Sequence, residues 1–507
     1  MKHNHPFIPA LIAAATVISA MTCACSNSKK DDAISDAPSS MVIEAPVLEP
    51  DFSDKSFKGE SFVICSSLEE YPEYNDNYID NEDYIGEAVN DAVITRNFAV
   101  EKKYEIRIFR RKENAEYVSR AVRSGTVDFD LVYDSGVDLA AYAVEGLFCD
   151  LKGMKDLDLS AQYWAPSTQI SLSLAGMLLT ATCDISMTRL DCTELYVFNK
   201  DLFDKYEVPY PYDYVNNGNW TFDRFIETVT SIGEDADADG LWTMKDIYGI
   251  DDFNIETFVR GAGLCKSLTV TNYDGKCSLN VYTKELVELY NMYNASLKNT
   301  HVVPSHVKWS NTSDTKRYES LNIDDKLISF IEGHTALQQM TMRDIAVITD
   351  LMDKSIGIVP IPKYTISQKE YYQEIEPYSP LFAVPKQLQN IEKTGAILEY
   401  FTYESMRIVL PAYFDQTLNS GCMSDPDSRD EKTLDIVRKS GYYRRTALYS
   451  AAIYDPTGMT WDPCTTMLDE MLRTGNFSAI QKAYRESAQR SIDDFWQRAR
   501  SSYGDGH

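Results

Sequence analysis

ELYVFNKDLFDKYEVPYPYDYV, residues 194–215, continues as NNGNWTFDRFIETVTSIGE and then as DADADGLWTMKDIYGI, which ends at Ile250. Its first six residues, 194–199, are a short apolar run that predicts a buried strand. A helical turn is expected next, and the two prolines at 209 and 211 end it. Thr221 is a candidate N-cap for a second helix. The apolar residues of that helix share one face: Phe222, Phe225, Ile226 and Val229.

Strands and helices alternate in the chain before this stretch. The predicted strands are residues 61–66, 105–109 and 130–133, and the predicted helices are residues 87–104, 114–124 and 137–146. This order predicts a parallel sheet with crossover helices, in which ligands bind beyond the carboxyl ends of the strands. Asp134 and Ser135 follow the third strand, so we expect them to contact a ligand. The alternative for Asp134 is an N-cap of the next helix.

Composition limits the partners. The chain has 507 residues, enough for two or three domains, and a net charge of −28. Nucleic acid is excluded as an expected partner, because phosphate binding needs a basic surface. The 33 tyrosines suit carbohydrate binding, although ordinary packing accounts for most of them.

The N-terminus predicts export. Residues 7–21 are largely apolar, but a membrane-spanning helix needs about 20 such residues, so a signal peptide is expected. The sequence Thr22-Cys23-Ala24-Cys25 resembles a bacterial lipobox, which implies cleavage before a lipidated Cys25 and an anchor on the outer face of the cell membrane. The alternative is a plain signal peptide cut elsewhere. Residues 26–58 read as a flexible tether.

The phrases FNKDLF, NWTFDRF and DADADG…YGI, in that order, resemble the bacterial extracellular solute-binding proteins of the maltose-binding type, family 1. These proteins are the substrate-capturing lipoproteins of ABC importers. Further phrases of this family are FIEGHTAL at 330–337, GIVPIPKY at 357–364 and YSPLFAV at 378–384. The resemblance covers roughly residues 60–500 of the chain.

The resemblance implies an α/β fold of the periplasmic-binding-protein type (type II). Two lobes, each a mixed sheet flanked by helices, are expected to meet at a hinge and to close when ligand selects the shut state. Residues 1–25 are the expected lipoprotein signal peptide. Lobe 1 is predicted over residues 59–168 and 335–385, and lobe 2 over residues 169–334 and 386–500.

The resemblance also implies seven ligand-binding residues: Asp134, Ser135, Trp164, Asp184, Arg343, Tyr378 and Trp461. Trp164 and Trp461 are candidate stacking platforms, with a core tryptophan as the alternative for each. Asp184 either faces the cleft or shapes a turn. The segment 339–343 is expected to contact ligand, and the maltose-type proteins carry an aromatic there. Arg343 departs from that pattern, which argues against maltodextrin; it is expected to pair with an acidic or polyhydroxyl ligand, or else to be a plain surface residue.

The run of alternating aspartates has the spacing of a calcium loop. The predicted ligands are Asp235, Asp237, Asp239, the carbonyl of Leu241 and, at the twelfth position, Asp246. An aspartate in place of the usual glutamate weakens bidentate closure of the loop. The ion would be structural, and an acidic solvated turn is the alternative. No cofactor is otherwise expected.

Ten cysteines occur, and eight remain when Cys23 and Cys25 are set aside. No C-x-x-C pair exists among them, which disfavours zinc ribbons and thioredoxin-type sites. Export permits disulfides, and the pairs Cys183–Cys192 and Cys265–Cys277 are close enough in sequence to form one each. Buried free thiols are the alternative.

The predicted function is that of a substrate-binding lipoprotein of an ABC importer, a monomer that captures a sugar or oligosaccharide and docks on permease subunits. We expect no enzyme activity, since G-x-S-x-G, H-E-x-x-H and P-loop motifs are absent from the sequence. Two alternatives stay open. One is an exported glycoside-acting enzyme, which needs two carboxylates across a bond. The other is an anchored solute sensor without a transporter.

Overall fold

The computed structural model describes residues 50, 52, 55–66, 68, 74, 78–79, 87–243, 245–264, 269–271, 277–304, 325–349, 351–352, 354–418, 429–450, 452 and 463–503. The helices and strands belong to one compact unit, Phe52–His507. Among the described helices, none combines the length and the apolar character needed to cross a bilayer.

The first sheet has the strand order β13-β3-β1-β2. Its strands are β1 (Ser61–Ser66), β2 (Arg107–Lys112), β3 (Leu131–Asp134) and β13 (Leu381–Ala383). The first three pair in parallel and β13 is antiparallel to β3. Three helices connect them along the chain: α1 (Ala88–Tyr104), α2 (Ala115–Ser124) and α3 (Gly136–Val144). The predicted alternation of strands and helices is confirmed, and β1 has the predicted bounds.

The two ends of α2 carry capping residues that can be recognised in the sequence. The Asn114 side chain accepts a hydrogen bond from the Tyr117 amide at the first turn. At the other end Gly125 adopts φ +72°, a left-handed conformation that glycine reaches without steric cost. Both signals are local, so the sequence alone places this helix.

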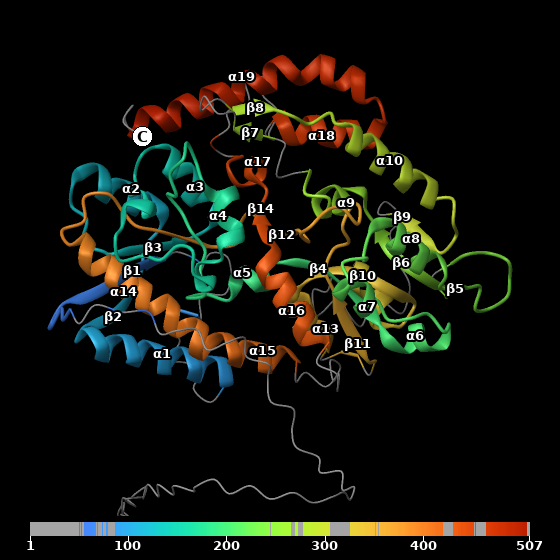
Figure 1. The fold of residues 1–507 in the computed structure, drawn as a ribbon, viewed down its shortest axis with the longest axis horizontal. Helices are drawn as coiled ribbons and strands as arrows, with labels where there is room; N and C mark the ends of the chain where they lie inside the picture. The colour runs from blue at the N-terminus through green and yellow to red at the C-terminus, as the bar shows by residue number, and fades with distance from the viewer. Residues whose placement is uncertain are drawn as a thin grey trace, which may run out of the picture. The chain divides into compact units, whose positions relative to one another are not determined.

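The second sheet has the order β11-β4-β10-β6-β5, with β9 also paired to β6. Its strands are β4 (Glu194–Asn199), β5 (Gly233–Glu234), β6 (Ile247–Phe253), β9 (Val302–Pro304), β10 (Thr335–Thr341) and β11 (Ile356–Val359). The sheet is mixed, because β10 runs parallel to β6 and antiparallel to β4. The helices around it, green to yellow in Figure 1, are α6 (Lys200–Lys205), α7 (Tyr212–Asn216), α8 (Phe222–Thr230), α9 (Ile255–Gly261), α10 (Lys284–Ser296), α12 (Asp325–Ile331) and α13 (Met342–Thr349).

Aromatic side chains fill the core of the second sheet. The rings of Phe222 and Phe258 meet edge to face with centroids 4.1 Å apart. Phe225 stacks on Phe253 at 6.3 Å, and the Trp220 indole donates to the Pro360 carbonyl at 2.9 Å. Such aromatic pairs add about 0.5–1.5 kcal/mol each beyond their buried area. The apolar face predicted after Thr221 therefore packs onto this sheet.

The chain passes between the two sheets in neighbouring segments. The first passage, residues 183–194, contains α5 (Thr188–Asp191), and the second, residues 373–381, contains β12 (Gln373–Ile375). The Glu376 amide donates to the Cys192 carbonyl at 3.0 Å, which joins the two passages. β12 also pairs in parallel with β14 (Gly441–Tyr443), which follows α16 (Arg429–Ser440).

The predicted lobe boundaries differ from the strand pairing. β10 and β11 were expected in lobe 1 but pair with β4 in the second sheet. α14 (Ile391–Glu404) was expected in lobe 2 but lies beside α1 in Figure 1, and the Tyr104 hydroxyl donates to the Ala396 carbonyl at 2.9 Å. The hydrophobic cores of both sheets need the same apolar pattern. The spacing of apolar residues in a segment therefore does not predict which sheet that segment joins. Near the first sheet, Met177 forms a single bridge with Leu174, and Ala181 forms one with Phe382 of β13.

The remaining elements lie mostly in the C-terminal part. They are α4 (Pro166–Leu172), β7 (Thr269–Thr271), β8 (Cys277–Leu279), a π-helical turn (Ser405–Val409), α15 (Leu410–Leu418), α17 (Arg445–Leu448), α18 (Pro463–Thr474) and α19 (Phe477–Tyr503). The single-turn 3-10 helices are Leu151–Gly153 and Gln162–Trp164.

One glycine marks the closest approach of a helix to the second sheet. A Cβ built on Gly249 in β6 would lie 1.7 Å from the carbonyl oxygen of Val229 in α8. Gly249→Ala is therefore expected to lower the free energy of unfolding by about 1–3 kcal/mol, the usual cost of overpacking. Urea denaturation measures this loss. Gly153→Ala is the matched control, since a Cβ there meets nothing within 4 Å; equal stabilities of the two variants would contradict the packing.

Candidate functional site

A small polar cavity of about 230 Å³ lies where the second sheet meets the second passage. The end of β10 and the start of α13 contribute most of its lining, β4 contributes its first residue, and the passage contributes one glutamate. The predicted ligand segment, residues 339–343, therefore lines a cavity. The full lining is Glu194, Gln339, Met340, Thr341, Arg343, Asp344 and Glu376.

A capping box positions the cavity side of α13. The Thr341 amide and hydroxyl donate to Asp344 Oδ2 at 2.8 and 2.9 Å. The Asp344 amide returns a bond to the Thr341 hydroxyl at 3.4 Å. These reciprocal bonds satisfy the first amides of the helix and fix its direction. The chain turns from strand to helix here, which places Arg343 in the first turn.

Arg343 faces Glu376 across the cavity. Its Nη2 lies 3.4 Å from Glu376 Oε2, its Nη1 lies 3.9 Å from Cys192 Sγ, and its guanidinium lies 5.8 Å from the centroid of the Tyr74 ring. Burial raises the pKa of Glu376, and the nearby Arg343 offsets part of that rise. Tyr74 follows β1 of the first sheet in the sequence, so Arg343 contacts residues from both halves of the fold.

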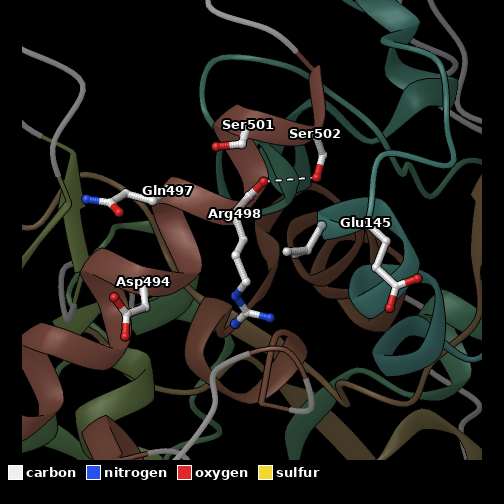
Figure 2. A pocket seen from close by; sticks show the side chains of 7 residues that line it. Glu145, Asp494, Gln497, Arg498, Ser501 and Ser502 are labelled. Atoms are coloured by element: carbon white, nitrogen blue, oxygen red, sulfur yellow. Dashed lines mark hydrogen bonds between the residues drawn. The ribbon is translucent and has the colours of Figure 1, made fainter.

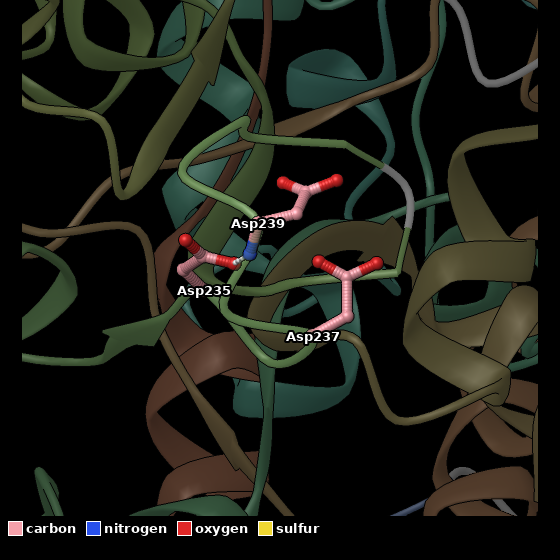
Figure 3. Close-up of side chains that lie close together, drawn as sticks. All are labelled: Asp235, Asp237 and Asp239. Carbon is pink, nitrogen blue, oxygen red and sulfur yellow. Dashed lines mark hydrogen bonds between the residues drawn. The ribbon is translucent and has the colours of Figure 1, made fainter.

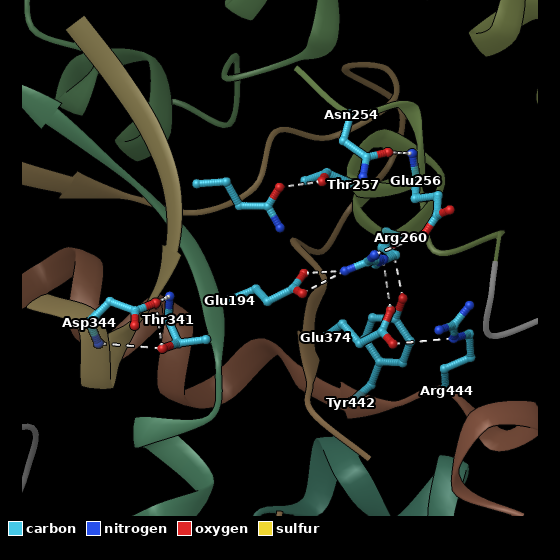
Figure 4. A network of polar contacts seen from close by, with 11 residues as sticks. Glu194, Asn254, Glu256, Thr257, Arg260, Thr341, Asp344, Glu374, Tyr442 and Arg444 are labelled. Atoms are coloured by element: carbon cyan, nitrogen blue, oxygen red, sulfur yellow. Dashed lines mark hydrogen bonds and ion pairs between the residues drawn. The ribbon is translucent and has the colours of Figure 1, made fainter. Parts of the chain in front are cut away.

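A charged network lies behind the cavity (Figure 4). Arg260 Nη1 contacts both oxygens of Glu194 at 2.5 and 2.7 Å, its Nη2 lies 3.1 Å from Glu256, and its Nε lies 3.3 Å from Glu374. Arg444 pairs with Glu374 at 3.2 Å. Burial alone would lower the pKa of Arg260, but its carboxylate neighbours raise it well above the ordinary value. Glu194 therefore enters the cavity lining with a permanently charged partner.

Asp134, Ser135 and Tyr378 are brought together at the start of α3. Asp134 Oδ1 accepts from the Ser135 amide at 2.8 Å, and the Gly136 amide donates to the Tyr378 carbonyl at 3.4 Å. Asp134 and Ser135 are each 1% exposed, whereas Tyr378 is 50% exposed. Ser135, not Asp134, holds the N-cap position. Of the three, Tyr378 presents the accessible side chain.

The structure places Trp164 and Asp184 in the interior. The Trp164 indole donates to Glu399 Oε2 at 2.8 Å, and the Tyr163 hydroxyl donates to Oε1 at 2.6 Å. Trp164 is 1% exposed, so it takes the core alternative, because a sugar ring needs an open aromatic face. Asp184 is fully buried, and its two oxygens contact Arg189 at 2.8 Å and Arg438 at 2.9 Å.

Two further predicted residues, Trp461 and Cys25, lie outside the described residues. Cys183 and Cys192 are buried free thiols, so the disulfide between them is not formed. For these two cysteines the alternative prediction, buried free thiols, is confirmed. Cys265 is also outside the described part, and its pairing with Cys277 stays a prediction.

The aspartate loop brings three of its predicted ligands together (Figure 3). Asp235, Asp237 and Asp239 each offer a carboxylate oxygen within 4.8 Å of the others. Asp246 does not join them. It is fully buried, and its carboxylate accepts from the Ala236 and Thr243 amides. Asp246, the predicted twelfth ligand, therefore stabilises the loop through hydrogen bonds to its backbone. The Leu241 amide donates to Asp239 at 2.7 Å.

A second, open cavity of about 700 Å³ lies beside α3 and α19 (Figure 2). Within it the Ser502 hydroxyl donates to the Arg498 carbonyl at 2.9 Å. The other lining residues are Val144, Glu145, Asp494, Gln497 and Ser501. It contains none of the residues predicted to bind ligand.

The sequence reasoning missed three acidic residues of the first cavity. Glu194 was read only as the start of a strand, and Asp344 and Glu376 were not singled out. A signal for Asp344 exists, because Thr341 and Asp344 have the spacing of a capping box at the end of an apolar strand. Glu376 and Glu194 have no local signal. They reach the cavity only because the two passages lie side by side.

No family model and no curated protein matches this sequence. Solved structures match its fold. A periplasmic oligogalacturonide-binding protein from Yersinia enterocolitica gives a TM-score of 0.51 at 13% identity, over 87% of this chain and 100% of that chain. A sugar transporter protein from Rhizobium etli, in an open conformation, gives 0.50 at 15% identity, over 86% and 99%. A designed esterase gives 0.53 at 12% identity, over 86% and 99%.

These identities are low, so the matches establish the fold and nothing finer. The chain has the mixed α/β fold of the two-lobed periplasmic solute-binding proteins. The expected fold class is confirmed. The likeness to the designed esterase is a likeness of fold in the same sense.

The buried Asp184 gives a prediction that separates a structural from a ligand-binding role. Asp184→Ala leaves Arg189 and Arg438 without their carboxylate, so the free energy of unfolding is expected to fall by about 3–5 kcal/mol. Glu227→Ala, which breaks the exposed pair with Arg224, is the control, with an expected loss within about 1 kcal/mol. Urea denaturation compares them. A stable Asp184→Ala protein with weakened solute binding would instead favour a cleft role.

Proposed function

We propose that this chain is the substrate-binding lipoprotein of an ABC importer and that it captures an extracellular sugar or oligosaccharide. The observation that carries the proposal is the small polar cavity at the passages between the two sheets. In α/β proteins, ligand sites gather where strands end and domains meet. Two proteins of matching fold, an oligogalacturonide-binding protein and a sugar transporter, support the same class of ligand.

The cavity chemistry supports a polyhydroxyl ligand. Sugar hydroxyls donate and accept hydrogen bonds, so a site that holds them needs both kinds of group. The lining supplies acceptors from its carboxylates, donors from Arg343, and the amide and hydroxyl of Gln339 and Thr341. The cavity volume, about 230 Å³, is below the range of roughly 300–1,000 Å³ typical of drug-sized ligands. One sugar unit therefore suits it better than a long chain.

Closure of two lobes about the ligand is the proposed mode of capture. In a hinge motion the backbone angles change at a few residues near the ends of helices and strands. The passages at 183–194 and 373–381 contain such residues. A ligand shifts the population toward the shut state only by its extra affinity for that state. Arg343 suits this mechanism because its contacts reach both halves of the fold: Tyr74, which follows β1, and Glu376 in the second passage.

The lipid anchor at Cys25 and docking on permease subunits complete the proposal. The lipobox supports the anchor. An anchored sensor shares the fold and differs only in its partner, so stable association with permease subunits favours the importer. We propose a monomer.

An enzyme is the second candidate, because the designed esterase matches the fold. The cavity lining gives it little support. Ester hydrolysis needs a nucleophile with an adjacent base, and the described residues that line this cavity include no histidine, serine or cysteine. Glycoside hydrolysis needs two free carboxylates, and Glu194 is held by Arg260 through both oxygens.

A thermal-shift screen of the lipid-free chain against mono- and oligosaccharides tests the function. A sugar that binds only the native state adds roughly 2.7 kcal/mol at 100 times its Kd. Arg343→Ala is expected to lose this shift. Arg107→Ala on β2 is the matched control. Arg107 also pairs with a glutamate, Glu101 at 3.3 Å, but it is not among the described residues that line the cavity. Release of product, or no shift with any sugar, would contradict the proposal.

We also propose that the aspartate loop holds a structural Ca²⁺. Its three converging carboxylates supply oxygens of the kind this ion prefers, and their mutual repulsion falls when a cation binds. Ca²⁺ is expected to raise Tm in a saturable way, and Asp237→Asn to reduce that rise. Asp213→Asn on the exposed side of α7 is the control. An equal rise with Mg²⁺, or an unchanged response of Asp237→Asn, would contradict a calcium site.

A further inference from the structure

The charges that line the first cavity do not balance. Among the described residues, three carboxylates and one guanidinium line it. The network behind it adds Glu256, Glu374, Arg260 and Arg444, so five carboxylates face three guanidinium groups and two negative charges remain in excess. Glu376 keeps its proton more readily than an ordinary glutamate because it is buried, yet even with Glu376 neutral the lining stays negative. The lining residues that carry charge are Glu194, Arg343, Asp344 and Glu376.

Both arginines near the cavity already face carboxylates. Arg260 lies within 3.3 Å of Glu194, Glu256 and Glu374. Arg343 lies 3.4 Å from Glu376. A ligand carboxylate that sought either guanidinium would have to displace a protein carboxylate. The displaced group would then sit in a partly buried place without its counter-charge, and breaking buried pairs of this kind is costly.

The lining therefore offers a ligand mainly acceptors. Besides Glu194, whose oxygens contact Arg260, the lining adds the carboxylates of Asp344 and Glu376 and the side-chain amide of Gln339. Hydroxyls satisfy these oxygens by donating, and an ammonium group does so with a favourable charge as well. An anionic ligand meets like charge in a small space where water screens weakly.

We propose that the cavity takes a hydroxylated solute with an amino group, an amino sugar, and rejects its carboxylated counterpart. This inference rests on the proposed sugar-binding function and narrows it. It also separates this chain from the matched oligogalacturonide-binding protein, since an oligogalacturonide is an acidic sugar.

Isothermal titration of the lipid-free chain at neutral pH and low salt tests the inference with three sugars of one ring geometry. Glucosamine, glucose and glucuronate form one such series, and the galacto and manno series are run in parallel. In a series that binds, the amino sugar is expected to bind at least about tenfold tighter than the neutral sugar, a difference of about 1.4 kcal/mol. The uronate is expected to bind at least about tenfold weaker than the neutral sugar.

The outcomes separate the two proposals. A uronate that binds tightest, or an amino sugar no tighter than the neutral one, overturns the inference and leaves sugar binding intact. No binding by these series or by the wider sugar panel overturns the proposed function together with the inference.

A single neutral substitution gives a sharper test. Glu376→Gln keeps the shape of the side chain, removes a negative charge and releases Arg343 from its carboxylate partner. Its ratio of amino-sugar to uronate affinity is expected to fall at least about tenfold relative to the parent chain. Urea denaturation reports that the variant is folded. Glu116→Gln, an exposed residue in the first turn of α2, is the control and is expected to keep the parent ratio. An unchanged ratio in Glu376→Gln overturns the inference.

Discussion

Asp184 is one buried carboxylate that holds two buried arginines, and the passages between the two sheets depend on it. The exposed fractions of the side chains are 0% for Asp184, 2% for Arg189 and 8% for Arg438. Arg189 belongs to the first passage. Arg438 belongs to α16, which leads into β14, and β14 pairs with β12 of the second passage. Asp184 therefore joins the first passage to α16, two distant segments of the chain, where the chain passes between the sheets.

This triad constrains the structure more than it stabilises it. Two guanidinium groups and one carboxylate leave a positive charge away from water, and desolvation offsets much of the attraction. Arg189 also donates to the Arg438 carbonyl at 3.3 Å, which supplies one further bond. The arrangement persists because every alternative position leaves an arginine buried without a carboxylate. The cavity begins a few residues away, where Glu376 bonds to Cys192, so the geometry of the site follows from how the passages are held.

The sequence allowed the local elements to be predicted, and much less of their assembly. Ser61–Ser66 and Glu194–Asn199 have the predicted bounds, because a short apolar run between polar turns is typical of a buried strand. The assignment of β10 to the first lobe was wrong, since a strand buried on both faces reads alike in either sheet. Trp164 shows the same limit for sites: an indole at a turn suits a cleft or a core, and the partner that decides, Glu399, lies 235 residues away in the sequence.

For the cavity, the resemblance located residues 339–343, but the charges that set its character came from elsewhere. Glu194 and Glu376 belong to two different passages, which are joined by the hydrogen bond from the Glu376 amide to the Cys192 carbonyl and by the bridge between Thr193 and Ile375. No spacing rule predicts such a pair. The charge of the expected ligand therefore needed the structure, because Arg343 alone left an acidic ligand, a polyhydroxyl ligand and a plain surface role open.

The overall charge and the local charge of this chain act on a ligand over different distances. A net charge of −28 attracts cations and repels anions around the molecule. At physiological ionic strength that field is screened beyond about 8 Å, so it influences how often a solute arrives more than which solute stays. Inside the cavity the carboxylates and the ligand are separated by less than the screening length. Discrimination between sugars of one shape and different charge therefore comes from the lining residues, and from whether Arg343 is paired with Glu376 when the sugar enters.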